Sequence, residues 1–257
     1  MKWKIISLIA FIVSFLLSYT ISMEYTTSEV STENQKISWG IGKLKDDNGQ
    51  PVDTIKANQM YLEYDCYFVG ANYPVIYLTF DNGYENGNTE MILDILKENT
   101  VSAIFFLTGD YAKDEYDLVK RMIEEGHVIG NHSFAHKDYA YISSEERIKD
   151  LGKLHHLMKE RYGYTMNLFR FPKGEYSLSS LRDVKEYGYK TLFWSFAYYD
   201  YNIKDQPSDE SALKKLKEGL HPGAIYLLHS VSNANMNVLD EFIKYAKQQG
   251  YTFTTFK

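Results

Sequence analysis

From residue 75 onward, short apolar stretches alternate with stretches whose apolar residues recur at helical spacing, and this alternation constrains the fold most strongly. Strands that alternate with helices usually lie parallel in one sheet, and each helix crosses over to the next strand. About seven such repeats in one domain favour an α/β barrel over an open sheet. The strand candidates are residues 75–80, 102–107, 127–131, 167–171, 191–194, 224–228 and 252–256.

Between the strand candidates, three stretches place their apolar residues on one helical face. The longest of them begins with a capping box that Ser143 and Glu146 can form. Gly188 and Gly250 lie where two helices should end, because glycine readily adopts the left-handed backbone of a helix terminus. The expected buried faces are Leu118, Val119, Met122 and Ile123, then Ile148, Leu151, Leu154 and Met158, and then Val238, Leu239, Phe242 and Ile243.

Polar residues recur at the carboxyl ends of the predicted strands. In α/β folds these ends gather at one edge of the sheet or one mouth of the barrel, where functional residues cluster. The sequence therefore predicts one polar site built from many strands. Its candidate residues are Asp81 and Asn82 after the first strand, His132 after the third, Arg170 near the end of the fourth, Asp200 after the fifth and His229 at the end of the sixth.

Two histidines separated by four residues suggest a metal site. On a helical turn, His132 and His136 would present two imidazoles on one face, able to hold one divalent ion. Histidine pairs in loops are more often not ligands, so the spacing alone decides little. The position of this pair directly after a strand end favours the metal site.

The position of Asp81 has two interpretations, a simple turn and a catalytic carboxylate. Asp81 precedes Asn82-Gly83, a common turn pair, so a simple turn accounts for the sequence. A carboxylate at the end of a buried strand is costly unless it is paired, however, and Arg170 is a candidate partner. With that partner, Asp81 could take a proton from a metal-bound water.

His229 ends the apolar string that begins at Ile225. A lone histidine there would more often serve as a structural hydrogen-bonding group. Beside a metal and a base, it could act as a general acid with a pKa near neutrality. Asp200 could orient His229 and favour its protonated form.

The N-terminus has the pattern of an export signal. Lys2 and Lys4 precede an apolar run from Ile5 to Leu17, and the apolar residues cover all faces rather than one stripe. Residues 1–23 fit a cleaved signal peptide or an uncleaved membrane anchor equally well. A buried N-terminal helix is a third interpretation. Residues 24–37 are predicted to be a polar linker, residues 38–72 a segment preceding the main domain, and residues 73–257 that domain.

Charge and cysteine content argue against a nucleic-acid-binding protein and against a disulfide-crosslinked scaffold. The net charge is −6, without a basic stripe or tail, so a nucleic-acid partner is not expected. Cys66 is the single cysteine, so the chain cannot form an internal disulfide.

Five short motifs, in order along the chain, resemble those of the polysaccharide deacetylases, carbohydrate esterase family 4. The resemblance covers about residues 73–257 and implies a distorted (β/α) barrel that hydrolyses an N-acetyl group of an amino sugar. The motifs are TFDN at Thr79–Asn82, HSFAH at His132–His136, RFPKG at Arg170–Gly174, the pair Asp200-Tyr201, and YLLH at Tyr226–His229.

The family resemblance implies a role for each site residue. Leu227 would line the pocket for the acetyl methyl group, and the Lys173 backbone N–H would stabilise the oxyanion. The cofactor would be a divalent metal, with zinc suited to imidazole and oxygen ligands and cobalt or manganese also fitting. Asp81 would be the base, and Arg170 would orient it. His229 would be the acid, and Asp200 would tune its pKa. His132, His136 and Asn82 would bind the metal.

The sequence departs from the family pattern at two positions. Most members have a second aspartate where this chain has Asn82, so the metal site loses one negative charge and its affinity should fall. Tyr201 replaces a tryptophan found in many members and keeps an aromatic wall for substrate. Tyr84, within the same string as Asn82, is a further candidate substrate contact.

The string TFDNGYENG and the motif Trp39–Gly42 resemble one subgroup, the N-acetylmuramic acid deacetylases that lead to muramic δ-lactam in spore cortex. By this resemblance the substrate is a peptidoglycan strand already stripped of peptides by a separate muramoyl amidase. The enzyme would be exported, either membrane-anchored or secreted into the wall or cortex space. Two alternatives stay open: a deacetylase of N-acetylglucosamine units in peptidoglycan or chitin-like oligomers, and an inactive peptidoglycan-binding module.

Overall fold

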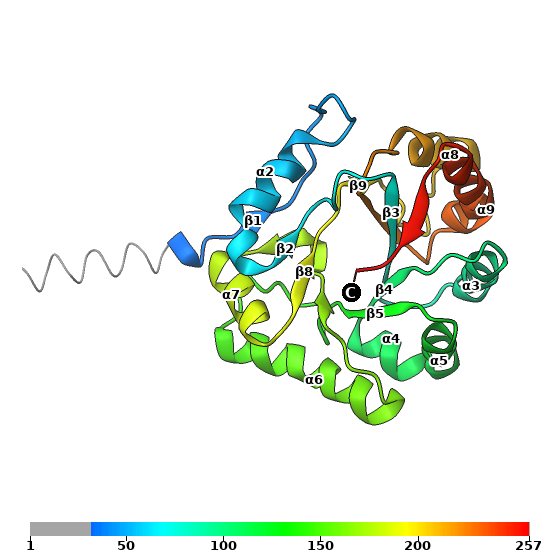
Figure 1. Ribbon diagram of the computed structural model, residues 1–257. Coiled ribbons are helices and arrows are strands. Elements are labelled where there is room, and N and C mark those ends of the chain that lie inside the picture. Colours follow the sequence, from blue (N-terminus) through cyan, green and yellow to red (C-terminus); the bar gives the residue numbers. More distant parts are fainter. Residues whose placement is uncertain (1–31, 257) are drawn as a thin grey trace, which may run out of the picture.

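The expected alternation of strands and helices is present in the computed structural model, which describes residues 32–256 (Figure 1). Each of the seven strand candidates overlaps a strand, and all seven strands belong to one parallel sheet. The α/β prediction is therefore confirmed. The strands are β3 (Val75–Asn82), β4 (Ile104–Leu107), β5 (Val128–Asn131), β6 (Leu168–Phe169), β8 (Lys190–Leu192), β10 (Ala224–His229) and β11 (Thr252–Thr254).

The sheet is strongly curled, and one chain segment spans its two ends. The strand order is β2-β8-β6-β5-β4-β3-β10-β9, with β11 paired to β3. Residues 190–197 contain both β8 and β9 (Phe196–Ala197), and β9 pairs with β10. Within this segment the Phe193 N–H donates to the Tyr67 carbonyl, and the Ser195 N–H donates to the Ile225 carbonyl. The segment thus brings opposite ends of the sheet together, which gives the distorted β/α barrel.

Residues 38–72, expected to precede the main domain, pack into the barrel. Strand β2 (Cys66–Tyr67) pairs with β8, and β1 (Ile37–Ser38) pairs antiparallel with β7 (Glu175–Tyr176). The Trp39 ring lies 4.4 Å from the Phe68 ring, centroid to centroid, and its indole N–H donates to the Trp194 carbonyl at 2.9 Å. Helix α2 (Val52–Met60) and the turn η1 (Leu62–Tyr64) connect these strands.

Helices surround the sheet, and most of the predicted apolar faces are buried (Figure 1). One residue was predicted wrongly: the Ile148 side chain is 37% exposed, because Arg147 and Asp150 take the inward positions on that turn. The capping box at Ser143 and the helix ends before Gly188 and Gly250 are confirmed. The helices are α3 (Thr89–Glu98), α4 (Gly109–Asp114), α5 (Tyr116–Glu124), α6 (Ser144–Tyr162), α7 (Leu178–Glu186), α8 (Asp209–Glu218) and α9 (Asn233–Gln248), with the turn η2 (Pro172–Gly174).

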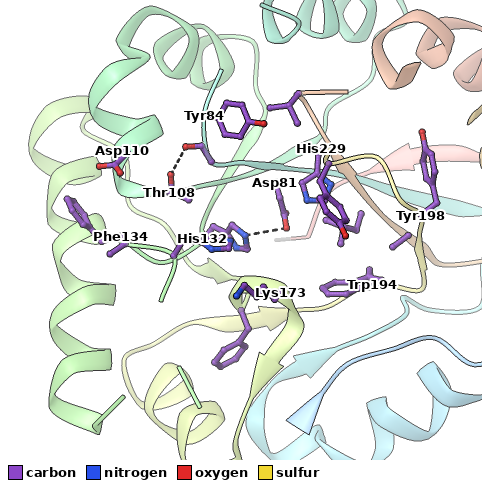
Figure 2. A pocket seen from close by; sticks show the side chains of 18 residues that line it. Asp81, Tyr84, Thr108, Asp110, His132, Phe134, Lys173, Trp194, Tyr198 and His229 are labelled. Carbon is purple, nitrogen blue, oxygen red and sulfur yellow. Dashed lines mark hydrogen bonds and ion pairs between the residues drawn. The ribbon is translucent and has the colours of Figure 1, made fainter. Parts of the chain in front are cut away.

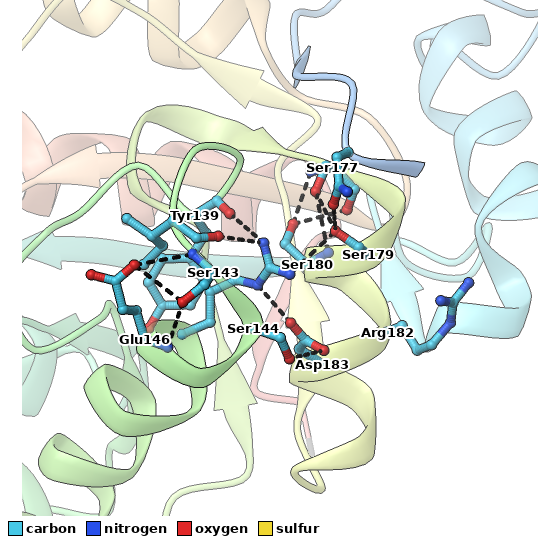
Figure 3. A network of polar contacts seen from close by, with 12 residues as sticks. Tyr139, Ser143, Ser144, Glu146, Ser177, Ser179, Ser180, Arg182 and Asp183 are labelled. Carbon is cyan, nitrogen blue, oxygen red and sulfur yellow. Dashed lines mark hydrogen bonds and ion pairs between the residues drawn. The ribbon is translucent and has the colours of Figure 1, made fainter. Parts of the chain in front are cut away.

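A buried polar network joins α6 to α7 (Figure 3). The Arg147 guanidinium forms an ion pair with Asp183 at 2.6 Å and also donates to the carbonyls of Tyr139 and Ile142, each at 2.9 Å. Ser144 donates to the same Asp183 carboxylate. The network therefore fixes the loop before α6 as well as the contact between the two helices.

The predicted signal or anchor, residues 1–23, lies outside the described residues, as does most of the predicted linker. Among residues 32–256, no helix combines the length and the apolar character needed to cross a membrane. Cys66 is buried, and burial raises the pKa of its thiol to about 12. A thiol with that pKa is protonated at neutral pH and unreactive.

We expect Arg147→Met to lower the free energy of unfolding by roughly 2–4 kcal/mol, because it leaves the mostly buried Asp183 carboxylate without its charged partner. The matched control is Arg182→Met, which removes an ion pair between half-exposed side chains, Arg182 and Glu33. That change should cost less than about 1 kcal/mol. Urea denaturation measures both, and equal losses would contradict the importance assigned to the network.

Candidate active site

The polar residues predicted from strand ends meet at a cavity of about 820 Å³ (Figure 2). The register of the sheet explains their meeting: His229 on β10 is paired with Asp81 on β3, and Leu227 is paired with Thr79. His132 follows β5, and its backbone N–H donates to the carbonyl of Leu107 at the end of β4. In Figure 2 the Asp81 side chain lies between the rings of His132 and His229.

Asp81 is held by a fully buried arginine. The Arg170 guanidinium donates to the Asp81 carboxylate at 2.8 Å, and it also donates to the Thr79 hydroxyl and to the carbonyls of Leu192 and Phe193. Burial acts to raise the pKa of Asp81, but the charge of Arg170 and, to a lesser degree, of neighbouring histidines lowers it below its ordinary value. The carboxylate is therefore ionised at neutral pH and can accept a proton.

His229 is paired with the carboxylate of Asp200, which favours the protonated form of its ring. Its Nδ1 lies 2.7 Å from one oxygen of the buried Asp200 carboxylate, and its backbone N–H donates to the other oxygen. Burial acts to lower the pKa of His229, yet the hydrogen bond and charge of Asp200, with a contribution from Asp81, raise it above its ordinary value. Since Nδ1 faces Asp200, Nε2 is the ring nitrogen left to donate a proton toward the cavity.

His132 and His136 are brought together, with ring centroids 5.0 Å apart, but by an irregular loop rather than the helical turn that their spacing suggested. The His132 Nδ1 faces the Arg170 carbonyl at 2.9 Å, which leaves its Nε2 unprotonated and 3.5 Å from an Asp81 oxygen. Burial lowers the pKa of His132 to about 4 and also lowers the pKa of His136. Both imidazoles are therefore neutral at pH 7, the form that binds metals.

The conformation of the loop that carries these histidines depends on Asp150 of α6, a residue that was not predicted from the sequence. The buried Asp150 carboxylate accepts hydrogen bonds from the backbone N–H groups of Phe134 and Ala135 and from the Tyr139 hydroxyl. The loop needs such support because Ser133 and His136 both have left-handed backbone, with φ of 66° and 51°. The sequence offered one hint of this role: Asp150 is a polar residue next to Leu151, on a helix face expected to be apolar.

The donor set fits a divalent metal. His132 and His136 offer two neutral imidazoles beside the Asp81 carboxylate, and the carbonyl that fixes the His132 ring is the usual support of a metal-bound histidine. Within residues 32–256, however, no group of three His, Cys, Asp or Glu side chains is placed to hold an ion. A third protein ligand would have to be a different group, such as the carboxamide of Asn82.

Asn82 lies next to the cavity but does not line it. Its side chain is fully buried, and its Oδ1 accepts a hydrogen bond from the Ser230 hydroxyl at 3.0 Å. Its Nδ2 forms no hydrogen bond of ordinary geometry among the described residues, and the Tyr111 hydroxyl is its polar neighbour. Amide oxygen and nitrogen are assigned from such contacts, so a half-turn of the carboxamide would exchange them. A buried amide whose Nδ2 forms no ordinary hydrogen bond within the described chain fits a ligand position, and the role of Asn82 as a metal ligand stays a prediction.

The predicted substrate contacts also lie at the cavity. Leu227 forms part of the apolar wall, beside Trp194, which was not predicted. Lys173, with a left-handed backbone at φ 59°, lines the cavity from η2. Tyr84 and Tyr201 are 51% and 55% exposed as residues, so they are available to contact a bound sugar. Of the residues predicted from the sequence, only Arg170, Asp200 and Asn82 lie behind the cavity wall.

Comparison with known proteins decides the family. Residues 69–192 match the polysaccharide deacetylase family. The peptidoglycan-N-acetylmuramic acid deacetylase PdaA of Bacillus subtilis is 42% identical over 223 residues, which cover 86% of this chain and 84% of that protein. The chain belongs to the polysaccharide deacetylase family. It is therefore a carbohydrate deacetylase, and the family is generally metal-dependent.

A solved structure and a second curated relative are also similar to this chain. The structure of B. subtilis PdaA, a family 4 carbohydrate esterase, superposes with a TM-score of 0.82 at 40% identity, covering 86% of this chain and 95% of that one. A peptidoglycan-N-acetylglucosamine deacetylase of Bacillus cereus is 31% identical over 182 residues, 69% of this chain and 65% of that protein. The expected distorted barrel is thus confirmed for this deacetylase.

We expect Asp200→Asn to lower the pKa of His229, because the variant loses the negative charge that favours the imidazolium. Asp200 raises the pKa of His229, so the ring stays protonated to higher pH in the unmodified protein than in the variant. An NMR titration of the His229 ring measures the change, with Asp117→Asn, at an exposed carboxylate outside the site, as the control. An unchanged pKa would show that Asp200 does not set the protonation of His229.

Proposed function

We propose that this chain hydrolyses the N-acetyl group of N-acetylmuramic acid in peptide-stripped peptidoglycan, with a divalent metal, leading to muramic δ-lactam in spore cortex. The observation that carries the chemistry is the pairing of Asp81 and His229 across β3 and β10. Their partners, Arg170 and Asp200, favour opposite charges on the two groups. The choice of muramic acid is supported by the higher identity and coverage of the B. subtilis N-acetylmuramic acid deacetylase.

In the proposed reaction, Asp81 takes a proton from the water that attacks the acetyl carbonyl carbon, and His229 gives a proton to the departing amine. The Lys173 backbone N–H helps to stabilise the oxyanion, and Leu227 contacts the acetyl methyl group. His132, His136 and Asn82 would hold the metal, most suitably zinc, with cobalt or manganese also fitting. A bound metal would polarise the carbonyl and lower the pKa of the water.

The proposed place of action is outside the cytoplasm, where peptidoglycan lies. The N-terminal pattern of two lysines before an apolar run supports export, either with a cleaved signal or as a membrane anchor. A free lactyl carboxyl is needed for lactam closure, so a separate muramoyl amidase would act first.

Acetate release from amidase-stripped peptidoglycan tests the proposal directly. We expect release in the presence of a divalent metal, loss of release by about 10²-fold or more in Asp81→Asn, and little release from chito-oligomers. Faster release from chito-oligomers than from stripped peptidoglycan would instead support the N-acetylglucosamine deacetylase. No release from a folded protein with any divalent metal would support the inactive binding module.

We expect Asn82→Asp to bind zinc about tenfold or more tightly without a gain in the rate of deacetylation. The variant adds a negative charge to the metal site, which strengthens binding, but the same charge weakens the polarisation of the acetyl carbonyl. Zinc competition with a chromophoric chelator measures affinity, and acetate release measures rate, with Asn167→Asp, at an exposed side chain outside the site, as the control substitution. Unchanged zinc affinity would show that Asn82 is not a ligand.

A further inference from the structure

A second cavity, of about 480 Å³, adjoins the active-site cavity, and Ala197 and Tyr198 line both. One wall of this second cavity comes from Ile41 and Gly42, within the Trp39–Gly42 motif. That motif pointed to a subgroup of deacetylases, although none of its residues lines the active-site cavity. Its conformation is fixed by the Trp39 indole, which donates to the carbonyl of Trp194. The motif therefore builds the second cavity rather than the first.

The second cavity is lined by three lysines, Lys43, Lys45 and Lys215. Among residues 32–256, none of the three forms an ion pair with a carboxylate; Lys45 donates to the Glu218 backbone carbonyl at 3.4 Å, and the Lys215 ammonium lies 5.4 Å from the centre of the Tyr198 ring. The one acidic lining residue of the described chain, Glu218, faces Lys214 at 3.9 Å. On a protein with a net charge of −6, this is a local excess of positive charge.

Three further charged or titratable groups lie near this cavity, and neither of the two acidic ones lines it. The Asp46 carboxylate accepts hydrogen bonds from the backbone N–H groups of Asn48 and Gln50, and its charge acts on His221. The Asp53 carboxylate is packed against Gly42, where a β-carbon would lie 1.9 Å from its Oδ2, and it does not line the cavity. His221 lines the cavity, but burial lowers its pKa to about 4, so it is neutral at pH 7. The second cavity is thus suited to an anion that also offers a sugar face to Tyr198.

We propose that the second cavity binds the lactyl carboxylate of a neighbouring muramic acid on the same glycan strand, while the first cavity holds the sugar being deacetylated. This inference rests on the proposed function. A muramic acid without its peptide carries a free carboxylate, whereas a peptide-bearing one has an uncharged amide at that position. The lysines would therefore favour stripped strands, and Tyr198 would contact the sugar that lies between the two cavities.

The test compares Lys43→Gln/Lys45→Gln/Lys215→Gln with a control triple variant at exposed lysines elsewhere, Lys120→Gln/Lys149→Gln/Lys159→Gln. On stripped strands of several disaccharides, we expect the first variant to raise KM about three- to tenfold with kcat unchanged, the size expected when partly solvated charge pairs are lost. On a single disaccharide, which has no neighbouring muramic acid, its KM should equal that of the unmodified protein.

Modified strands identify the carboxylate. When lactyl carboxyls are converted to methylamides, the KM difference between the variant and the unmodified protein should disappear. Strands that keep their peptides are not substrates under the proposed function, so their binding is measured by calorimetry. An equal loss of affinity for those strands in the triple variant would assign the cavity to a peptide carboxylate and overturn the proposal. An equal effect on the disaccharide, or in the control variant, would overturn it as well.

A failure of the proposed function can be told apart from a failure of this inference. If no acetate is released from any muramic substrate, calorimetric binding of stripped strands and of their methylamides still measures recognition by the lysines. Weaker binding of stripped strands by the triple variant alone would support the second cavity as an anionic site. Equal binding by the variant and the unmodified protein would overturn it.

Discussion

The ion pair between Arg170 and Asp81 is the interaction on which the site depends. Both groups are buried, and an isolated charge at either position would be strongly disfavoured. The guanidinium is satisfied by the Thr79 hydroxyl and by two carbonyls of residues 192–193 as well as by the carboxylate. Those carbonyls belong to the segment that spans the two ends of the curled sheet. The closure of the barrel and the charge of Asp81 are therefore parts of one arrangement.

The same pair organises the neighbouring histidines. The Arg170 carbonyl fixes the ring of His132, while its guanidinium fixes Asp81, so one residue sets the orientation of two. On the other side, Asp200 raises the pKa of His229. A carboxylate with a lowered pKa and an imidazole with a raised pKa thus lie side by side, which is the arrangement that a base and an acid in one reaction require.

Much of this could be predicted from the sequence because it depends on local pattern. The seven strands have apolar runs, and strand ends converge by topology, so Asp81, His132, His136 and His229 could be placed together before their contacts were known. The two-residue strands β1, β2, β7 and β9 were not predicted, because their positions depend on pairing with strands distant in the sequence, whereas the equally short β6 lies within the predicted strand 167–171. Ile148 was wrongly assigned to a buried face because a buried, paired arginine competes with it for the inward position. Asp150 could not be found, since its role depends on a helix meeting a loop.

The central physical claim is that Arg170 keeps the buried Asp81 ionised, and the most direct measurement is a ¹³C NMR titration of the Asp81 carboxyl in the metal-free protein. The account predicts a pKa below the ordinary aspartate value of about 3.9, despite burial. A pKa well above that value would mean that burial outweighs the ion pair. Asp81 could then not be the resting base, and the division of roles between Asp81 and His229 would be contradicted.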